Sequence, residues 1–320
     1  MWRSGRLFLW VVPLLLLLGA CRSAPPPGNP ALPPGFADAP LPDAPVAAYV
    51  YFAQQEPLRL HPGAFAAEAQ DEEAVRLSSL AAWLAPDAQT FGASGLFPNP
   101  QDATAVEDIL REVQPPIWTL RSGQRVYLVR GEGSAADALR QAIQNGRQVR
   151  LQDAYPKAWD ALRRLPEKPP GTPVAAGFAL TTREFLEALS RRTGGDVGGL
   201  QQALGTARIE VVAFALYVSQ PLALDRPLQG GPLAFLDQHK AVALAVGRAS
   251  VPAVVIRAAL GVVARQAGLQ PHTVEGQTVY ALQQDGIHMR LRAQGNIFYL
   301  AAAPRPEDAD RAIASTFPPK

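Results

Sequence analysis

The chain has 320 residues, of which 48% are hydrophobic and 18% charged, a balance typical of folded proteins and not of disordered ones. The formal net charge is +2, and without Arg3 and Arg6 the 28 remaining basic residues equal the 28 acidic ones. A nucleic-acid-binding protein needs a concentrated basic excess, so that class is excluded. The single cysteine, Cys21, rules out a disulfide within the chain, and a chain of this length can bury enough apolar surface without one.

The N-terminus has the pattern of a leader for export. Arg3 and Arg6 form a short positive region, residues 7–18 form an apolar run, and Gly19 and Ala20 are the small residues that precede a cleavage site. The apolar run is shorter than the roughly 20 residues that a membrane span needs. We therefore expect a signal peptide over residues 1–20, with a non-cleaved signal anchor as the alternative.

The run Leu18-Gly19-Ala20-Cys21 resembles the lipobox of bacterial lipoproteins. In that family a peptidase cuts before the cysteine, and the cysteine sulfur carries a diacylglycerol. The resemblance implies cleavage between Ala20 and Cys21, fatty acids such as palmitate at Cys21, and a membrane as the partner of this anchor. Arg22 replaces the aspartate that favours retention at the inner membrane. This implies the outer membrane, or the outer face of the cytoplasmic membrane in a cell with one membrane.

Residues 21–44 are expected to form a proline-rich tether, because the stretch from Arg22 to Pro45 contains nine prolines, Pro45 included. Proline fixes φ and lacks a backbone donor, which excludes helix and central strand. Such a segment tends to extended polyproline II, at about 3 Å per residue. We expect it to hold the folded body away from the membrane without packing against that body.

The rest of the chain contains two matched pairs of segments. Pro45-Val46-Ala47-Ala48 recurs as Pro173-Val174-Ala175-Ala176, and each leads into an apolar strand. Leu120–Gly123 matches Leu291–Gly295, and each forms a glycine turn between two strands that an acidic helix follows.

Because the order of these matches is kept, we predict an α+β fold of two tandem, diverged repeats over residues 45–168 and 169–320. Each repeat is expected to be an antiparallel sheet with packed helices; chance similarity of such units is the alternative. The layout resembles an uncharacterised family of secreted bacterial proteins with paired α+β repeats, which has no established activity.

Hydrophobic periodicity predicts further elements in chain order. Strict alternation over His288–Arg292 places Met289 and Leu291 on one face of a strand and the two arginines on the other. Thr181-Thr182-Arg183-Glu184 has the pattern of a capping box. We expect helices at 66–84, 102–113, 181–191 and 250–267, and strands at 208–218, 240–246 and 278–283.

Residues 131–136, Gly-Glu-Gly-Ser-Ala-Ala, match the G-x-G-x-x-A motif of dinucleotide-binding βαβ units, and a strand over 148–153 would complete the unit. Glu132, however, would place a carboxylate beside a pyrophosphate, and the preceding strand is expected to pair antiparallel with residues 116–121. We therefore predict a turn in which Ser134 caps a helix and Asp137 completes the capping box, and no cofactor.

No other segment has a catalytic or metal-binding pattern. The four histidines are too far apart in sequence for a local metal pair, and the acidic run of residues 71–73 is expected to be solvated. Tyr49 and Tyr51 share a strand face, where they could form a binding platform or pack in the core. We predict no catalytic, cofactor-binding or metal-binding residue. The histidines are His61, His239, His272 and His288.

These features predict a membrane-anchored envelope lipoprotein with a non-catalytic binding or scaffolding role and a possible envelope protein partner. The alternatives are an envelope hydrolase whose site is assembled only in three dimensions, and a carrier of an apolar ligand. A deep pocket with convergent polar groups would favour the hydrolase, and a deep apolar cavity would favour the carrier. Filled layers of sheet and helix would favour the scaffold.

Overall fold

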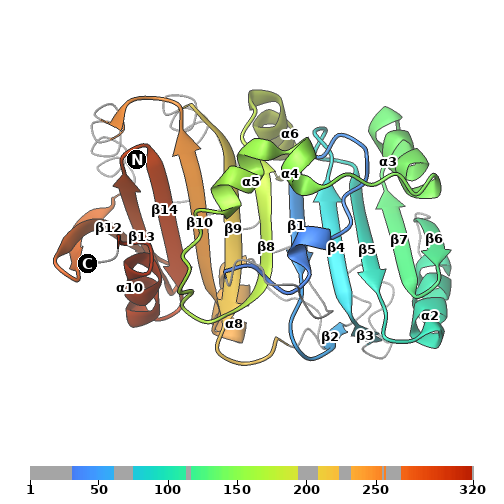
Figure 1. The fold of residues 1–320 in the computed structure, drawn as a ribbon, viewed down its shortest axis with the longest axis horizontal. Helices are drawn as coiled ribbons and strands as arrows, with labels where there is room; N and C mark the ends of the chain where they lie inside the picture. The colour runs from blue at the N-terminus through green and yellow to red at the C-terminus, as the bar shows by residue number, and fades with distance from the viewer. Residues whose placement is uncertain are drawn as a thin grey trace.

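The computed structural model describes residues 31–60, 75–112, 117–193, 208–222, 232–253, 256 and 268–318. Over these residues the protein is mixed α+β, with a large antiparallel sheet and helices packed on both of its faces (Figure 1). The predicted α+β class is confirmed. The expected pair of separate sheets is replaced by one continuous sheet of 12 strands, because strands from both halves of the chain pair at its centre.

The strands of the large sheet follow the order β11-β12-β13-β14-β10-β9-β8-β1-β4-β5-β7-β6, and each neighbouring pair is antiparallel. A separate small sheet pairs β2 (Leu58–Leu60) with β3 (Val75–Leu77). The bounds are β1 Ala48–Phe52, β4 Ser79–Leu84, β5 Phe91–Leu96, β6 Trp118–Ser122, β7 Arg125–Arg130, β8 Thr172–Leu180, β9 Ile209–Val218, β10 Val242–Ala249, β11 Gln270–Val274, β12 Gln277–Gln284, β13 Ile287–Gln294 and β14 Ile297–Ala303.

Most central strands are apolar on both faces. All six residues of β4 and all five of β1 are buried. The helix expected over 66–84 is therefore wrong for residues 75–84, which form β3 and β4, while residues 66–74 lie outside the described part. A continuous apolar run is compatible both with the apolar stripe of a helix and with a strand buried on both faces. Such a run becomes a strand where neighbouring strands are available to pair with it.

Helices cover the two faces of the sheet. On one face, called here the α2 face, α2 (Pro100–Glu112) and α8 (Pro232–His239) pack against the strands. The opposite face, called the α5 face, carries four helices in the described part of the chain. These are α3 (Ser134–Gln144), α4 (Leu151–Ala154), α5 (Pro156–Leu162) and α10 (Pro306–Ala314).

Several predicted elements are confirmed. The helices expected at 102–113 and 181–191 are α2 and α6 (Arg183–Thr193), and the Thr182 hydroxyl accepts a hydrogen bond from the Phe185 amide at the start of α6. The strands expected at 208–218, 240–246 and 278–283 are β9, β10 and β12. Most of the helix expected at 250–267 lies outside the described residues.

The N-terminal segment, residues 31–46, packs against the α5 face. Ala31, Phe36 and Leu41 are at most 3% exposed. The Val149 amide donates to the Leu41 carbonyl at 3.0 Å. The expectation of an undocked tether is therefore wrong from residue 31 onward. Proline prevents helix and central strand, but it leaves the apolar side chains between prolines free to pack.

Phe36 covers the tyrosines of β1. Its ring centroid lies 6.2 Å from that of Tyr49 and 6.0 Å from that of Tyr51. Both tyrosines point to the α5 face, as the alternation predicts, and both are nearly inaccessible to solvent. Burial raises the pKa of Tyr49 well above its ordinary value. The two tyrosines thus belong to the core and do not form an exposed platform.

The close approach of β1 and β8 requires glycine at position 177. A Cβ atom there would lie 2.0 Å from the Tyr49 carbonyl oxygen and 2.7 Å from Cζ of Phe214. We expect Gly177→Ala to lower the free energy of unfolding by about 1–3 kcal/mol, since the backbone of β1 must shift. Chemical denaturation measures this loss. Gly247→Ala is the control: the nearest atom is 3.4 Å away, so a comparable loss in both variants would contradict the explanation.

Two substitutions within residues 31–46 test whether docking of this segment stabilises the protein. Phe36→Ala is expected to cost about 3 kcal/mol, because it removes a buried ring from the contact with Tyr49 and Tyr51. Asp38→Ala changes an exposed residue of the same 3₁₀ turn and is expected to cost less than about 0.5 kcal/mol. Equal thermal midpoints for the two variants would show that the segment adds no stability.

Candidate functional site

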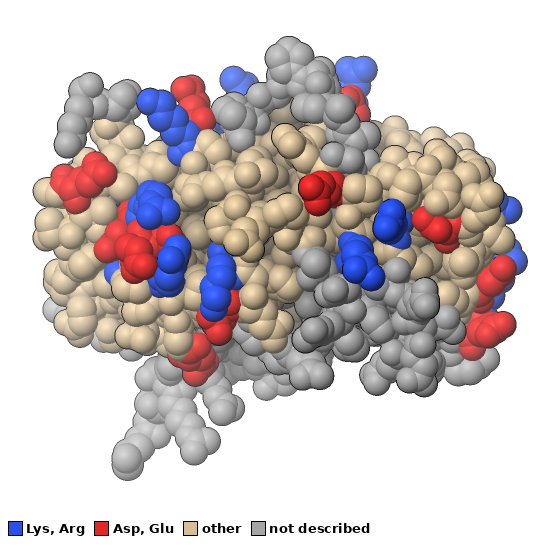
Figure 2. All heavy atoms as spheres, turned by 90° about the horizontal axis from the view of Figure 1, so that it is seen from below, with Lys and Arg blue, Asp and Glu red and all other residues tan. Residues whose placement is uncertain are grey.

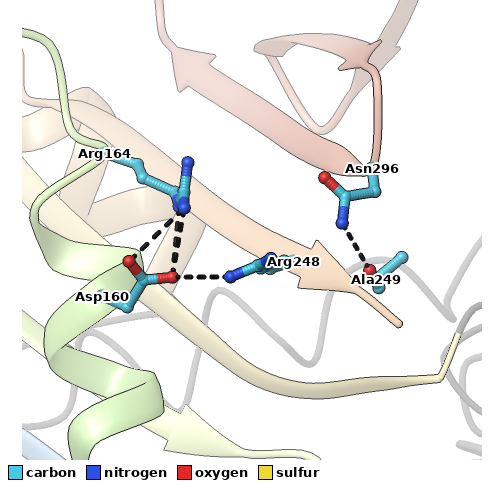
Figure 3. Close-up of polar contacts among 5 residues, drawn as sticks. All are labelled: Asp160, Arg164, Arg248, Ala249 and Asn296. Atoms are coloured by element: carbon cyan, nitrogen blue, oxygen red, sulfur yellow. Dashed lines mark hydrogen bonds and ion pairs between the residues drawn. The ribbon is translucent and has the colours of Figure 1, made fainter. Parts of the chain in front are cut away.

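A group of charged side chains lies on the α5 face where α5 meets β10 (Figure 3). Asp160 of α5 accepts hydrogen bonds from Arg164, just beyond the end of that helix, and from Arg248 of β10. Both Nη2 of Arg164 and Nη1 of Arg248 lie 3.2 Å from Oδ2 of Asp160. One carboxylate oxygen therefore accepts from two guanidinium groups that come from separate elements.

Arg292 of β13 lies on the same face and is 7% exposed. The register of β13 and β14 places it directly beside Tyr299. Its guanidinium carbon lies 4.5 Å from the ring centroid of Phe317 and 6.0 Å from that of Tyr299. Nη2 donates to Oε1 of Gln294 at 3.1 Å. Cation–π contacts and a neutral amide therefore surround this charge.

Arg292 differs from the other buried charges. Arg290 is paired with Asp310, and the buried carboxylate of Glu107 accepts from Arg111 and Arg121. Within the described part of the chain, no carboxylate forms an ion pair with Arg292. Burial lowers the pKa of Arg292, because removal from water disfavours its charged form. The guanidinium still keeps its charge near neutral pH, since its ordinary pKa is far higher.

Tyr299 of β14 is close enough to both Arg164 and Arg292 for their charges to act on its hydroxyl. Burial raises the pKa of its hydroxyl, while Arg164 and Arg292 oppose that shift. Three arginines and one carboxylate give the group a formal charge of +2. We call Arg164, Arg248, Arg292 and Asp160 the arginine cluster. Planar guanidinium groups on one face can bind the oxygens of a phosphate or carboxylate group.

No local pattern in the sequence predicts this cluster. Asp160 and Arg164 have the spacing of a helical ion pair, but Arg248 and Arg292 are 88 and 132 residues away from Asp160. The alternation that places Arg290 and Arg292 opposite Met289 and Leu291 is confirmed. The alternation does not show that Asp310 of helix α10 pairs with Arg290, nor that Arg292 packs against the rings of Tyr299 and Phe317.

The end of the sheet where α2, α8 and α10 lie, at the bottom of Figure 1, carries charges of both signs. Figure 2 shows Lys and Arg side chains next to Asp and Glu side chains there, with broad uncharged areas between them. On α10, Arg305 and Arg311 both pair with Asp308. This part of the described surface therefore has no concentrated field of one sign.

The two best-defined cavities among the described residues are small. The larger, about 30 Å³, lies between α2 and strands β3, β4, β5 and β7, and the other is about 10 Å³. Such volumes hold one or two water molecules at most and no lipid chain. Only apolar side chains and Gly95 line the larger cavity: Val75, Leu77, Leu80, Ala93, Phe97, Val106, Ile109, Leu110, Val126 and Leu128.

The G-x-G-x-x-A segment follows β7, whose neighbours β5 and β6 are both antiparallel to it. The strand considered at 148–153 is wrong: residues 151–154 form helix α4. No parallel βαβ unit therefore exists here. At Gly131 a Cβ atom would lie 2.9 Å from Cα of Thr90. The glycine is thus explained by close packing.

The predicted cap of α3 is also wrong. The N-cap residue is Gly133, with φ 83° and ψ −170°, and no side chain makes a cap hydrogen bond. Ser134 is the first residue of the helix instead. A positive φ with extended ψ is accessible almost only to glycine, so the backbone moves the cap position one residue earlier than the motif predicted.

The histidines described here serve separate contacts. Nε2 of His272 lies 3.3 Å from Oδ1 of Asp310, which also accepts from Arg290. The ring of His239 packs 4.6 Å from that of Phe235. His288 is half-buried on β13, and His61 and the acidic run 71–73 lie outside the described residues. Across the described ranges, no three His, Cys, Asp or Glu side chains gather closely enough for a metal ion.

Ala20 and Cys21 lie outside the described residues, so the cleavage and lipidation sites remain predictions. Among the helices that the structure describes, none is long and apolar enough to cross a membrane.

No family model matches the chain, and no curated protein matches it. Among solved structures, the chain is similar to crystal form III of TP0453, at 9% identity and a TM-score of 0.39, over 87% of this chain and 98% of that chain. It is also similar to crystal form I of TP0453, at 9% identity and a TM-score of 0.36, over 91% and 98% of the two chains.

Two neighbouring substitutions test the start of α3. Gly133→Ala is expected to cost about 1–3 kcal/mol from backbone strain alone, because no atom lies within 4 Å of the added Cβ. Ser134→Ala is expected to cost less than about 0.5 kcal/mol, because the Ser134 side chain makes no cap hydrogen bond. Urea denaturation of both variants measures the two losses of unfolding free energy. A larger loss for Ser134→Ala would show that the Ser134 side chain caps the helix.

Proposed function

We propose that this chain is a membrane-anchored lipoprotein of the cell envelope with a non-catalytic binding or scaffolding role at the membrane surface. The lipobox that ends at Cys21 supports the anchor. The observation that carries the proposal is the docking of residues 31–46 on the sheet, because it connects the folded body directly to the lipid-bearing end of the chain.

The connection is short. Nine residues, 22–30, separate Cys21 from Ala31, where the packed segment begins. A fully extended chain spans at most about 3.5 Å per residue, so the body starts within roughly 35 Å of the anchor. A tether that continued undocked to residue 44 would have more than twice this reach. The body is thus positioned to act at the membrane that holds it, at the outer membrane or the outer face of the cytoplasmic membrane.

We further propose that residues 45–168 and 169–320 are diverged copies of one unit. The order of strands supports this origin: β1-β4-β5-β7-β6 runs outward from the centre on one side, and β8-β9-β10-β14-β13 on the other. The hairpins β6–β7 and β13–β14 turn at Gly123 and Gly295, whose φ values are 61° and 62°. Helices α3 and α10 follow the two hairpins.

The anchor is tested by metabolic labelling with a fatty acid. We expect the full-length protein to incorporate the label and to partition into detergent. Cys21→Ala is expected to abolish both and to leave the leader attached, because the peptidase and the acyl transfer depend on that sulfur. Cys21→Ser is the matched control for side-chain size. A label that persists in either variant would contradict lipidation at Cys21.

A further inference from the structure

The N-terminal segment and the arginine cluster lie on the same face of the sheet. Tyr217 of β9 donates a hydrogen bond to the Ala31 carbonyl, and Tyr217 pairs with Val242 at the start of β10. Arg248 lies six residues farther along β10 with its side chain on that same face. Six residues of strand span about 20 Å. The distance along β10 from the level of Ala31 to Arg248 is therefore shorter than the roughly 35 Å that residues 22–30 can span.

The outer part of the cluster is open to solvent. The side chains of Arg164 and Arg248 are 31% and 54% exposed, and that of Asp160 is 45% exposed. Asp160 neutralises one of these two arginines, and the buried Arg292 adds a further positive charge beside Tyr299. Neither of the two cavities is lined by residues of the arginine cluster. The cluster is therefore an open surface, and it is suited to an anionic group that is itself displayed on a surface.

We propose that the arginine cluster binds the phosphate groups of anionic lipids in the membrane that carries the Cys21 anchor, and so turns the α5 face toward that membrane. This inference rests on the proposed lipid anchor. Two properties favour a lipid headgroup over a soluble phosphate compound. The anchor keeps the cluster close to headgroups, and a net positive, open surface complements a negatively charged bilayer.

A single-thiol label on the full-length lipoprotein tests the orientation. Cys21 is acylated in the mature protein, so an introduced cysteine is the sole free thiol. Ser250→Cys places a fluorophore at an exposed site next to β10, and Ala105→Cys places one at an exposed site of α2, on the opposite face. The protein is reconstituted into phosphatidylglycerol vesicles that contain a lipid with a quencher on its headgroup.

We expect strong quenching at position 250 and weak quenching at position 105. Arg164→Gln with Arg248→Gln is expected to reduce the preference for this orientation by about tenfold or more, because each basic residue near an anionic surface strengthens association severalfold. Arg183→Gln with Arg191→Gln changes the charge of exposed α6 residues equally and is expected to leave the quenching unchanged. Phosphatidylcholine vesicles and raised salt are expected to weaken the difference.

Three outcomes would overturn the inference: equal quenching at the two positions, quenching that is insensitive to the cluster variant, or the same pattern in phosphatidylcholine. Thermal stabilisation by inorganic phosphate that only the cluster variant loses, without a difference in quenching, would identify a site for soluble phosphate instead. Failure of the lipid anchor itself is distinguishable, because the protein would then not enter vesicles of either composition.

Discussion

The antiparallel pairing of β1 with β8 is the contact on which the rest of the architecture depends. It joins the first strand of one half to the first strand of the other, so each half extends outward from the centre. The pairing is close enough that Gly177 cannot carry a side chain without displacing the β1 backbone. A sheet built in this way has central strands with no solvent-facing side, and both of its faces must be covered.

Helices provide most of this cover, and the N-terminal segment provides the part over β1. Phe36 packs against the rings of both Tyr49 and Tyr51 on the α5 face. A proline-rich segment suits this position, since each proline has no backbone donor that would need a partner, and other amides of the segment donate to nearby carbonyls, as Asp43 does to Arg147. The same residues that complete the core thereby lead from the centre of the sheet toward the proposed lipidation site at Cys21.

The α5 face has one region in which charges are paired and one region with an excess of positive charge. Charges under and on α10 are paired within the protein, as in Arg290 with Asp310 and Asp308 with Arg305. The arginine cluster has fewer carboxylates than guanidinium groups, and Arg292 contacts rings and amides in place of an anion. A chain whose total charge is nearly zero can therefore still present a local positive site, because folding brings together arginines that are far apart in sequence.

Local chemistry in the sequence determined the α+β class, the strand alternation over residues 288–292, the glycine turns at Gly123 and Gly295, and the lipobox pattern at Cys21. Each of these depends on residues that are neighbours along the chain, so propensity and periodicity suffice to predict it. Tertiary structure decided that residues 75–84 are strands, that residues 31–46 dock, that Gly133 is the N-cap of α3, and that Arg164 and Arg248 share Asp160. Each of those outcomes depends on which distant segment the chain meets, and neither composition nor spacing contains that information.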